Sequence, residues 1–122
     1  MRNFKDFKRV SEIRVTTHHE EFKALCAEGW VEIGVMLIPP VMASLIPAIV
    51  AIKGPYLGFV IVLGRLQEQE RSVGDEIFSE PDPDKINQKL KEGWTLVGIV
   101  TGTTTAFSRY GDYFASSFAL SR

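Results

Sequence analysis

Hydrophobic and polar positions along the chain first alternate and then recur at helical spacing. Residues 10–17 alternate apolar or β-branched side chains with polar ones, which predicts a strand. Phe22, Leu25 and Cys26 follow at the i, i+3, i+4 spacing that forms the buried stripe of a helix. Two more strands are predicted in this first half, at residues 30–38 and 56–63. The first half therefore has the order strand, helix, strand, strand.

The same order starts again after a polar connector at residues 66–74. A helix is predicted from Asp82 to Glu92, with Pro83 at an early position that suits proline. The strands predicted around it span residues 75–79, 94–101 and 113–121. The second half thus has the elements of the first.

Both predicted helices stop at a glutamate, a glycine and a tryptophan. Gly29 and Gly93 are expected in the left-handed conformation that ends many helices, where a side chain is costly. At the start of the first helix, Thr17 is predicted as the N-cap, with Glu20 completing a capping box. Gly34, in the strand after the first tryptophan, is expected to allow a bulge or close packing.

Identical residues link the two halves at constant spacing. Glu12, Ile13, Glu28, Gly29, Trp30 and Gly34 recur 64 positions later, and Tyr56, Leu63 and Arg65 recur 57 positions later. One domain at residues 1–122, with internal repeats at about 10–65 and 74–122, is therefore predicted. The predicted fold class is α+β: tandem βαββ repeats form an antiparallel sheet with two helices on one face. Such units commonly face each other across a pseudo-twofold axis.

Residues 35–52 contain no charged side chain, and this is the most unusual stretch of the sequence. Pro39, Pro40 and Pro47 would break a helix through it, so a membrane span is disfavoured. We expect an apolar loop or short helix that is buried against another subunit, because monomers rarely leave such a patch in water. A homo-oligomer is therefore predicted.

Charge and cysteine content narrow the class of protein further. The net charge of -1 provides no basic field for generic nucleic-acid binding, and 45% apolar residues are ordinary for a globular chain. Cys26 is the only cysteine, which excludes an intrachain disulfide and fits a reducing, cytoplasmic setting. Residues 1–9 alternate charges with phenylalanine and do not have the apolar core of a secretory signal. Phe4 and Phe7 are expected to pack against neighbouring residues.

The sequence does not bring together residues for catalysis or for a metal site. His18 and His19 are adjacent at a helix start, where they cannot face each other, and capping or surface roles are expected. Cys26 is predicted to be buried and inert, with no histidine cluster around it. No enzyme activity and no cofactor are predicted.

The loop at residues 101–112 is the best candidate for a ligand site, although a solvated hairpin loop is the alternative. Arg109 offers bidentate contact with a phosphate, and Phe107 and Tyr110 offer surfaces on which a ring can stack. The remaining predicted ligand-binding residues are Thr103, Thr104 and Arg65, the last from the same or a neighbouring chain.

Two resemblances follow from these residues. The helix that ends in Glu-Gly-Trp before an apolar strand resembles a family of small bacterial and phage domains of unknown function, here in tandem over residues 11–36, 56–65, 75–101 and 113–122. Size and architecture also resemble phage anti-Thoeris proteins, which are oligomers that sequester cyclic ADP-ribose-type signals. The function expected is non-enzymatic binding of a small anionic, nucleotide-derived ligand. A protein-protein assembly module that uses residues 35–52 is the alternative.

Overall fold

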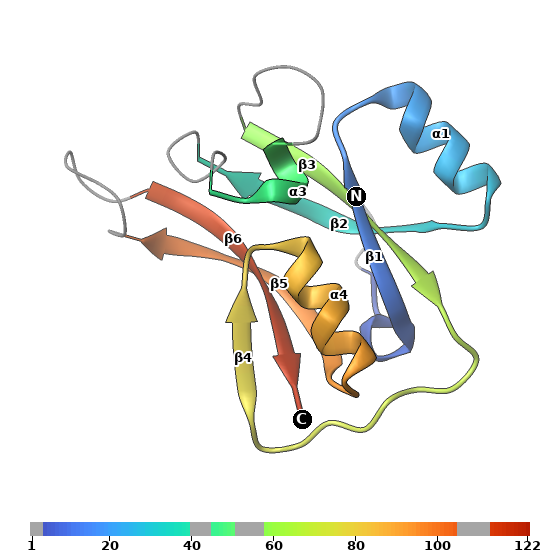
Figure 1. Cartoon of the computed structure of the whole chain (residues 1–122), viewed down its shortest axis with the longest axis vertical. Coiled ribbons are helices and arrows are strands. Elements are labelled where there is room, and N and C mark those ends of the chain that lie inside the picture. Colours follow the sequence, from blue (N-terminus) through green and yellow to red (C-terminus); the bar gives the residue numbers. More distant parts are fainter. Residues whose placement is uncertain (1–3, 40–44, 51–57, 105–112) are drawn as a thin grey trace.

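The computed structural model describes residues 4–39, 45–50, 58–104 and 113–122. It confirms the predicted α+β class, but the strands form two separate three-stranded antiparallel sheets in place of one (Figure 1). The first half contributes η1 (Phe7–Arg9), β1 (Val10–Thr16), α1 (His19–Ala27), β2 (Val31–Ile38), α3 (Pro47–Val50) and β3 (Gly58–Leu66). The second half contributes β4 (Ile77–Glu80), α4 (Pro83–Lys91), β5 (Thr95–Thr104) and β6 (Tyr113–Ser121).

The two sheets have the same strand order. Sheet A is β1-β3-β2 and sheet B is β4-β6-β5, so in each half the last strand lies between the first two. This is a split β-α-β arrangement, in which the flanking strands are parallel and both pair antiparallel with the middle strand. The register also shifts at equivalent positions, immediately before Gly34 in β2 and before Gly98 in β5. The bulge expected at Gly34 is therefore confirmed.

The ends of α1 and α4 close in the same way. Gly29 has a φ of 100° and Gly93 a φ of 98°, as predicted for left-handed residues. The following tryptophan N–H reaches back to the helix in both copies, from Trp30 to the Leu25 carbonyl and from Trp94 to the Lys89 carbonyl, each at 3.0 Å. This Schellman arrangement satisfies the last helical carbonyls and sets the direction in which each tryptophan leaves the helix.

The helix starts differ from each other, and one prediction was wrong. Asp82 caps α4 by accepting a hydrogen bond of 3.0 Å from the Asp84 N–H, with Pro83 at the first helical position. The N-cap of α1 is His18, not Thr17, and no side chain caps this helix. Thr16 instead accepts a hydrogen bond from the His18 N–H at 3.1 Å, which holds the chain in an extended conformation one residue longer than expected.

The two halves are stacked, so that non-equivalent faces of the sheets meet. Val60 and Val62 of β3 lie in the large core together with Phe118 and Leu120 of β6. Leu63 of β3, which corresponds to Leu120, points the other way, into a small cluster with α1. A twofold axis would bring equivalent faces together, so the expected pseudo-twofold arrangement is wrong.

The two helices accordingly lie on different layers. Figure 1 shows α4 between β4 and β1, and α1 at the outer side of sheet A. The Asn87 side chain of α4 fixes this contact, because it accepts a hydrogen bond from the Ile13 N–H at 2.8 Å and donates to the Ile13 carbonyl at 3.0 Å. The layers are therefore α1, sheet A, and then α4 together with sheet B.

The described part of the uncharged stretch at residues 35–52 packs within its own chain. Met36, Ile38, Ile46 and Ile49 are all buried in the large core. Leu45 is the exposed exception, at 56%, while residues 40–44 and 51–57 lie outside the described residues. A partner is therefore not needed to explain these four side chains, and the assembly-module alternative stays a prediction.

Three smaller expectations had different outcomes. Phe4 and Phe7 pack against the large core, as expected, with their rings 5.0 Å apart. Cys26 is exposed on α1, so the prediction that it is buried was wrong: only Leu25 of the predicted stripe is buried, and Phe22 is partly buried. Among the described residues, no helix is long and apolar enough to cross a membrane.

Candidate functional site

Two arginines lie over the ring of Trp30 on the outer side of sheet A. The guanidinium carbon of Arg65 is 4.6 Å from the ring centroid and that of Arg14 is 5.6 Å from it. The indole itself is buried against Leu25 of α1 and Leu63 of β3. We call the group formed by Arg14, Trp30 and Arg65 the Trp30 site.

The sheet register explains why these residues meet. Arg14 of β1 is directly opposite Leu63 of β3, and opposite residues share a face of an antiparallel sheet. Arg65 lies two residues beyond Leu63 and therefore on the same face. Trp30 reaches this face because the left-handed Gly29 turns the chain from α1 into β2. Three different elements thus contribute to one small patch of surface.

The chemistry of this patch is that of an anion site. A guanidinium that stacks on an aromatic ring keeps its N–H donors in its own plane, where they remain free to bind a phosphate or carboxylate. Arg14 and Arg65 are both exposed. Among the described residues, the ion pairs are Asp6–Arg9, Glu80–Lys85 and Glu76–Arg122. Neither arginine of the Trp30 site is neutralised by them.

The second half contains a related group around Trp94, which we call the Trp94 cluster. Arg122 lies 4.7 Å from the ring centroid of Trp94, and Lys89 lies 5.3 Å from it. Phe78 occupies the position that corresponds to Arg14, with its ring 6.0 Å from that of Trp94. Glu76 pairs with Arg122 at 3.7 Å, so this cation already has an anionic partner.

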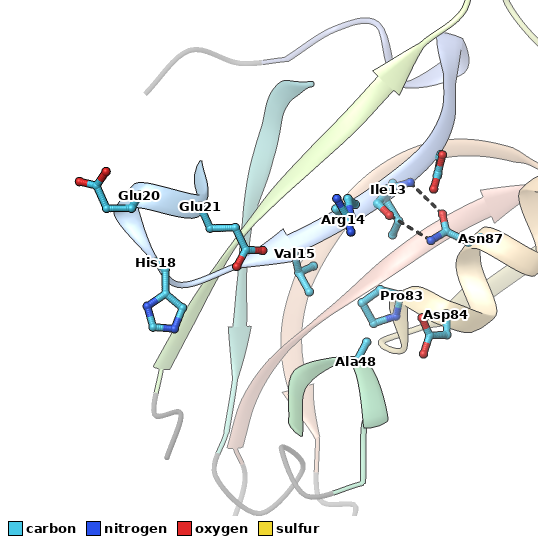
Figure 2. Close-up of a pocket in the computed structure, with 11 residues that line it drawn as sticks. Ile13, Arg14, Val15, His18, Glu20, Glu21, Ala48, Pro83, Asp84 and Asn87 are labelled. Carbon is cyan, nitrogen blue, oxygen red and sulfur yellow. Dashed lines mark hydrogen bonds between the residues drawn. The ribbon is translucent and has the colours of Figure 1, made fainter. Parts of the chain in front are cut away.

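A cavity among the described residues has the opposite electrostatic character. It has a volume of about 720 Å³ and lies between the start of α1, β1 and the start of α4. Figure 2 places His18, Glu20 and Glu21 at one end and Pro83, Asp84 and Asn87 at the other. Its charged lining consists of Glu12, Glu20, Glu21, Asp84 and Arg14. Four carboxylates against one guanidinium repel an anion, so this cavity is not the anionic site that the sequence predicts.

The remaining candidate ligands for metals or catalysis lie apart. His18 lines the cavity, while Cys26 lies exposed on α1. Within the described ranges, no group of three or more histidine, cysteine or acidic side chains is arranged to hold a metal ion.

The structure describes three of the six residues that were predicted to bind a ligand. Arg65 belongs to the Trp30 site, near the end of β3. Thr103 and Thr104 close β5, opposite Phe114 and Tyr113 of β6. The ends of β3 and β5 lie on opposite sides of the molecule (Figure 1), so Arg65 does not join the two threonines within one chain. Phe107, Arg109 and Tyr110 lie outside the described residues.

Sequence analysis missed Arg14 and Trp30 as members of the site. Trp30 was assigned only to the helix ending, and Arg14 only to a strand. Pairing β1 with β3 in register would have placed Arg14 beside Leu63, and so near Arg65. That register depends on the shift between Val10 and Glu12, which alternation of residues does not reveal.

Comparison with known proteins gives no relative for this chain. No family model, curated protein or solved structure matches it. The two resemblances drawn from the sequence therefore stay predictions.

Proposed function

We propose that this chain is a non-enzymatic binding protein for a small anionic, nucleotide-derived ligand, whose phosphate is held at the Trp30 site. The observation that carries the proposal is the pair of exposed guanidinium groups on one buried indole, neither of them in an ion pair with a described residue. Such arginines are preorganised for phosphate, because stacking restricts the side chain before the ligand arrives.

The two arginines have complementary roles in this proposal. Arg65 is the closer of the two to the indole and provides the bidentate contact. Arg14 adds a second charge from β1 and orients the ligand across the sheet. Glu12 lies opposite Arg65 in the β1–β3 register and limits how much negative charge the site accepts.

Calorimetric titration tests the proposal. Pyrophosphate, ADP-ribose and cyclic nucleotides are titrated into the protein at low salt, where screening of an exposed site is weakest. Removing one charge-assisted hydrogen bond costs about 1.5–3 kcal/mol, so Arg65→Gln should weaken binding roughly 10- to 100-fold. Arg122→Gln is the matched control, because Arg122 also stacks on a tryptophan but is paired with Glu76.

Two results would count against the site. One is no heat and no thermal shift with any member of the panel. The other is an equal loss of affinity in Arg65→Gln and Arg122→Gln, which would place the anion elsewhere. Sequestration without catalysis has its own test: mass spectrometry of ligand released after long incubation should recover it unchanged.

A further inference from the structure

One face of sheet B consists almost entirely of small, uncharged residues. Because Phe118 and Leu120 point into the large core, the alternate residues of β6 point to the opposite side. Those residues and their neighbours on β5 are Ala115, Ser117, Ala119, Gly98, Val100 and Gly102, paired across the ladder. We call this surface the open face. Ile77 of β4 extends it and is 69% exposed.

A Cβ atom added at Gly98 or Gly102 on this face would have no atom within 4 Å, so the described residues leave the face uncovered at these positions. α4 packs on the side of sheet B that carries Phe118 and Leu120, and α1 packs on sheet A. The connector at residues 66–74 reaches only the end of the face near Ser121. There the Ser121 hydroxyl and the Gly74 backbone exchange hydrogen bonds of 2.8 and 3.0 Å. Val100, at the middle of the face, is 53% exposed.

A solvated sheet face normally carries charged or strongly polar side chains, and the open face carries none. The equivalent face of sheet A shows what such a surface does in this chain. Met36, Val60 and Val62, which correspond to Val100, Ser117 and Ala119, are completely buried against the second half. Equivalent faces therefore differ between the two sheets: in sheet A this face packs against the second half of the chain, and in sheet B it faces solvent.

We propose that the open face is where a second copy of this chain packs, face to face about a twofold axis. Uncharged small residues make the surface complementary to itself, because a twofold contact sets no like charges against each other. Ala, Ser and Gly also let two sheets approach closely along their whole length. Head-to-tail stacking is disfavoured, because the outer side of sheet A is already occupied by α1, Arg14 and Arg65.

The size of the face sets the strength of this dimer. Seven residue pairs of β5 and β6 lie along it, from Gly98–Ala119 to Thr104–Tyr113. With standard strand spacings, β5 and β6 over this length cover roughly 200–250 Å² on each chain, and the four-residue β4 adds area at only one end. This is below the ~800 Å² per partner of a stable interface, so the dimer is weak and forms at high concentration. The Trp30 site lies on the opposite outer layer, so both sites stay open in the dimer.

Sedimentation velocity of the full chain tests this, from about 10 μM to about 1 mM. The mass should rise toward that of two chains, and Val100→Lys should keep the protein as a single chain by setting like charges together. Val73→Lys is the control, because Val73 is similarly exposed, at 49%, but lies in the connector. Far-UV circular dichroism confirms that each variant is folded.

Cross-linking identifies the surface independently. In a Cys26→Ser background, Ser117→Cys places a thiol near the proposed axis and should form a disulfide-linked dimer under mild oxidation. The wild-type chain carries its exposed thiol at Cys26 on α1 and should cross-link much less. The proposal is overturned if the wild type remains a single chain throughout the range, if Val100→Lys associates equally well, or if Cys26 cross-links more readily than the thiol at 117.

Discussion

The Trp30 site and the Trp94 cluster are the same local structure in two environments. Each tryptophan follows a left-handed glycine, and each has the guanidinium of an arginine over its ring, 4.6 Å away for Arg65 near the end of β3 and 4.7 Å away for Arg122 directly after β6. Trp94 lies in the large core, and its arginine is paired with Glu76. Trp30 lies in a small outer cluster, and its arginine is accompanied by a second one, Arg14.

The comparison distinguishes the structural role of the motif, which both halves share, from a binding role that only the Trp30 site can have. The shared part, the helix end and the stacked arginine, closes a helix and shields an indole in both halves. The difference lies in ion pairing: Arg122 of the Trp94 cluster is paired with Glu76, whereas neither arginine of the Trp30 site forms an ion pair with a described residue. We therefore place the proposed function at the Trp30 site, where the guanidinium groups of Arg14 and Arg65 remain available to a ligand.

The largest expected effect comes from removing the two indoles. Trp94→Ala should destabilise the chain by about 3–5 kcal/mol, because its cavity opens in a core shared by both sheets. Trp30→Ala should cost less, since α1 contributes only Leu25 and Phe22 to a small cluster that can relax. Urea unfolding followed by circular dichroism measures both, and equal costs would contradict the proposed difference between the two environments.

Next in size is the contact that joins α4 to sheet A. Asn87→Ala removes both side-chain hydrogen bonds to Ile13 and should lower the free energy of unfolding by about 1–3 kcal/mol. Lys23 occupies the corresponding position on α1 and is exposed, so Lys23→Ala should change it by less than about 0.5 kcal/mol. A small effect of Asn87→Ala would mean that apolar packing alone holds the halves together.

The glycines should give similar effects in the two halves. A methyl group at Gly29 or Gly93 would have no atom within 4 Å, so a substitution there tests backbone conformation without a clash. Gly29→Ala and Gly93→Ala should each cost about 1–2 kcal/mol, the strain of a left-handed alanine. Thermal unfolding of the two variants checks this. A much larger loss for either would show that the turn has a role beyond closing the helix.

The smallest effects on stability are expected from the equivalent residues Glu12 and Glu76, and their effects on anion binding should differ. Glu76→Gln removes an exposed ion pair with Arg122 and should cost no more than about 1 kcal/mol. Glu12→Gln should leave stability unchanged and tighten anion binding at the Trp30 site, because a nearby negative charge is removed. Calorimetry with pyrophosphate compares them, and weaker binding by Glu12→Gln would argue against the proposed site.

The local prediction succeeded where neighbouring residues decide the structure. The glycine-stopped helices, the proline start of α4 and the bulge before Gly34 all depend on backbone conformations that few residue types adopt. Prediction failed for the burial of Cys26, and the contact of residues 35–52 with another subunit stays a prediction. Helical spacing does not say how deep a face is buried, and an uncharged stretch is compatible with a partner or with the chain's own core.

The sequence by itself determined two βαββ units, their helix ends and the candidate arginine at the end of β3. Only the tertiary structure decided that the strands divide into two sheets and that unlike faces of those sheets meet. It also decided that Arg14 shares the indole of Trp30 with Arg65. The physical reason is that local conformation follows from each residue and its neighbours, whereas the choice between faces of a sheet depends on contacts far apart in the chain.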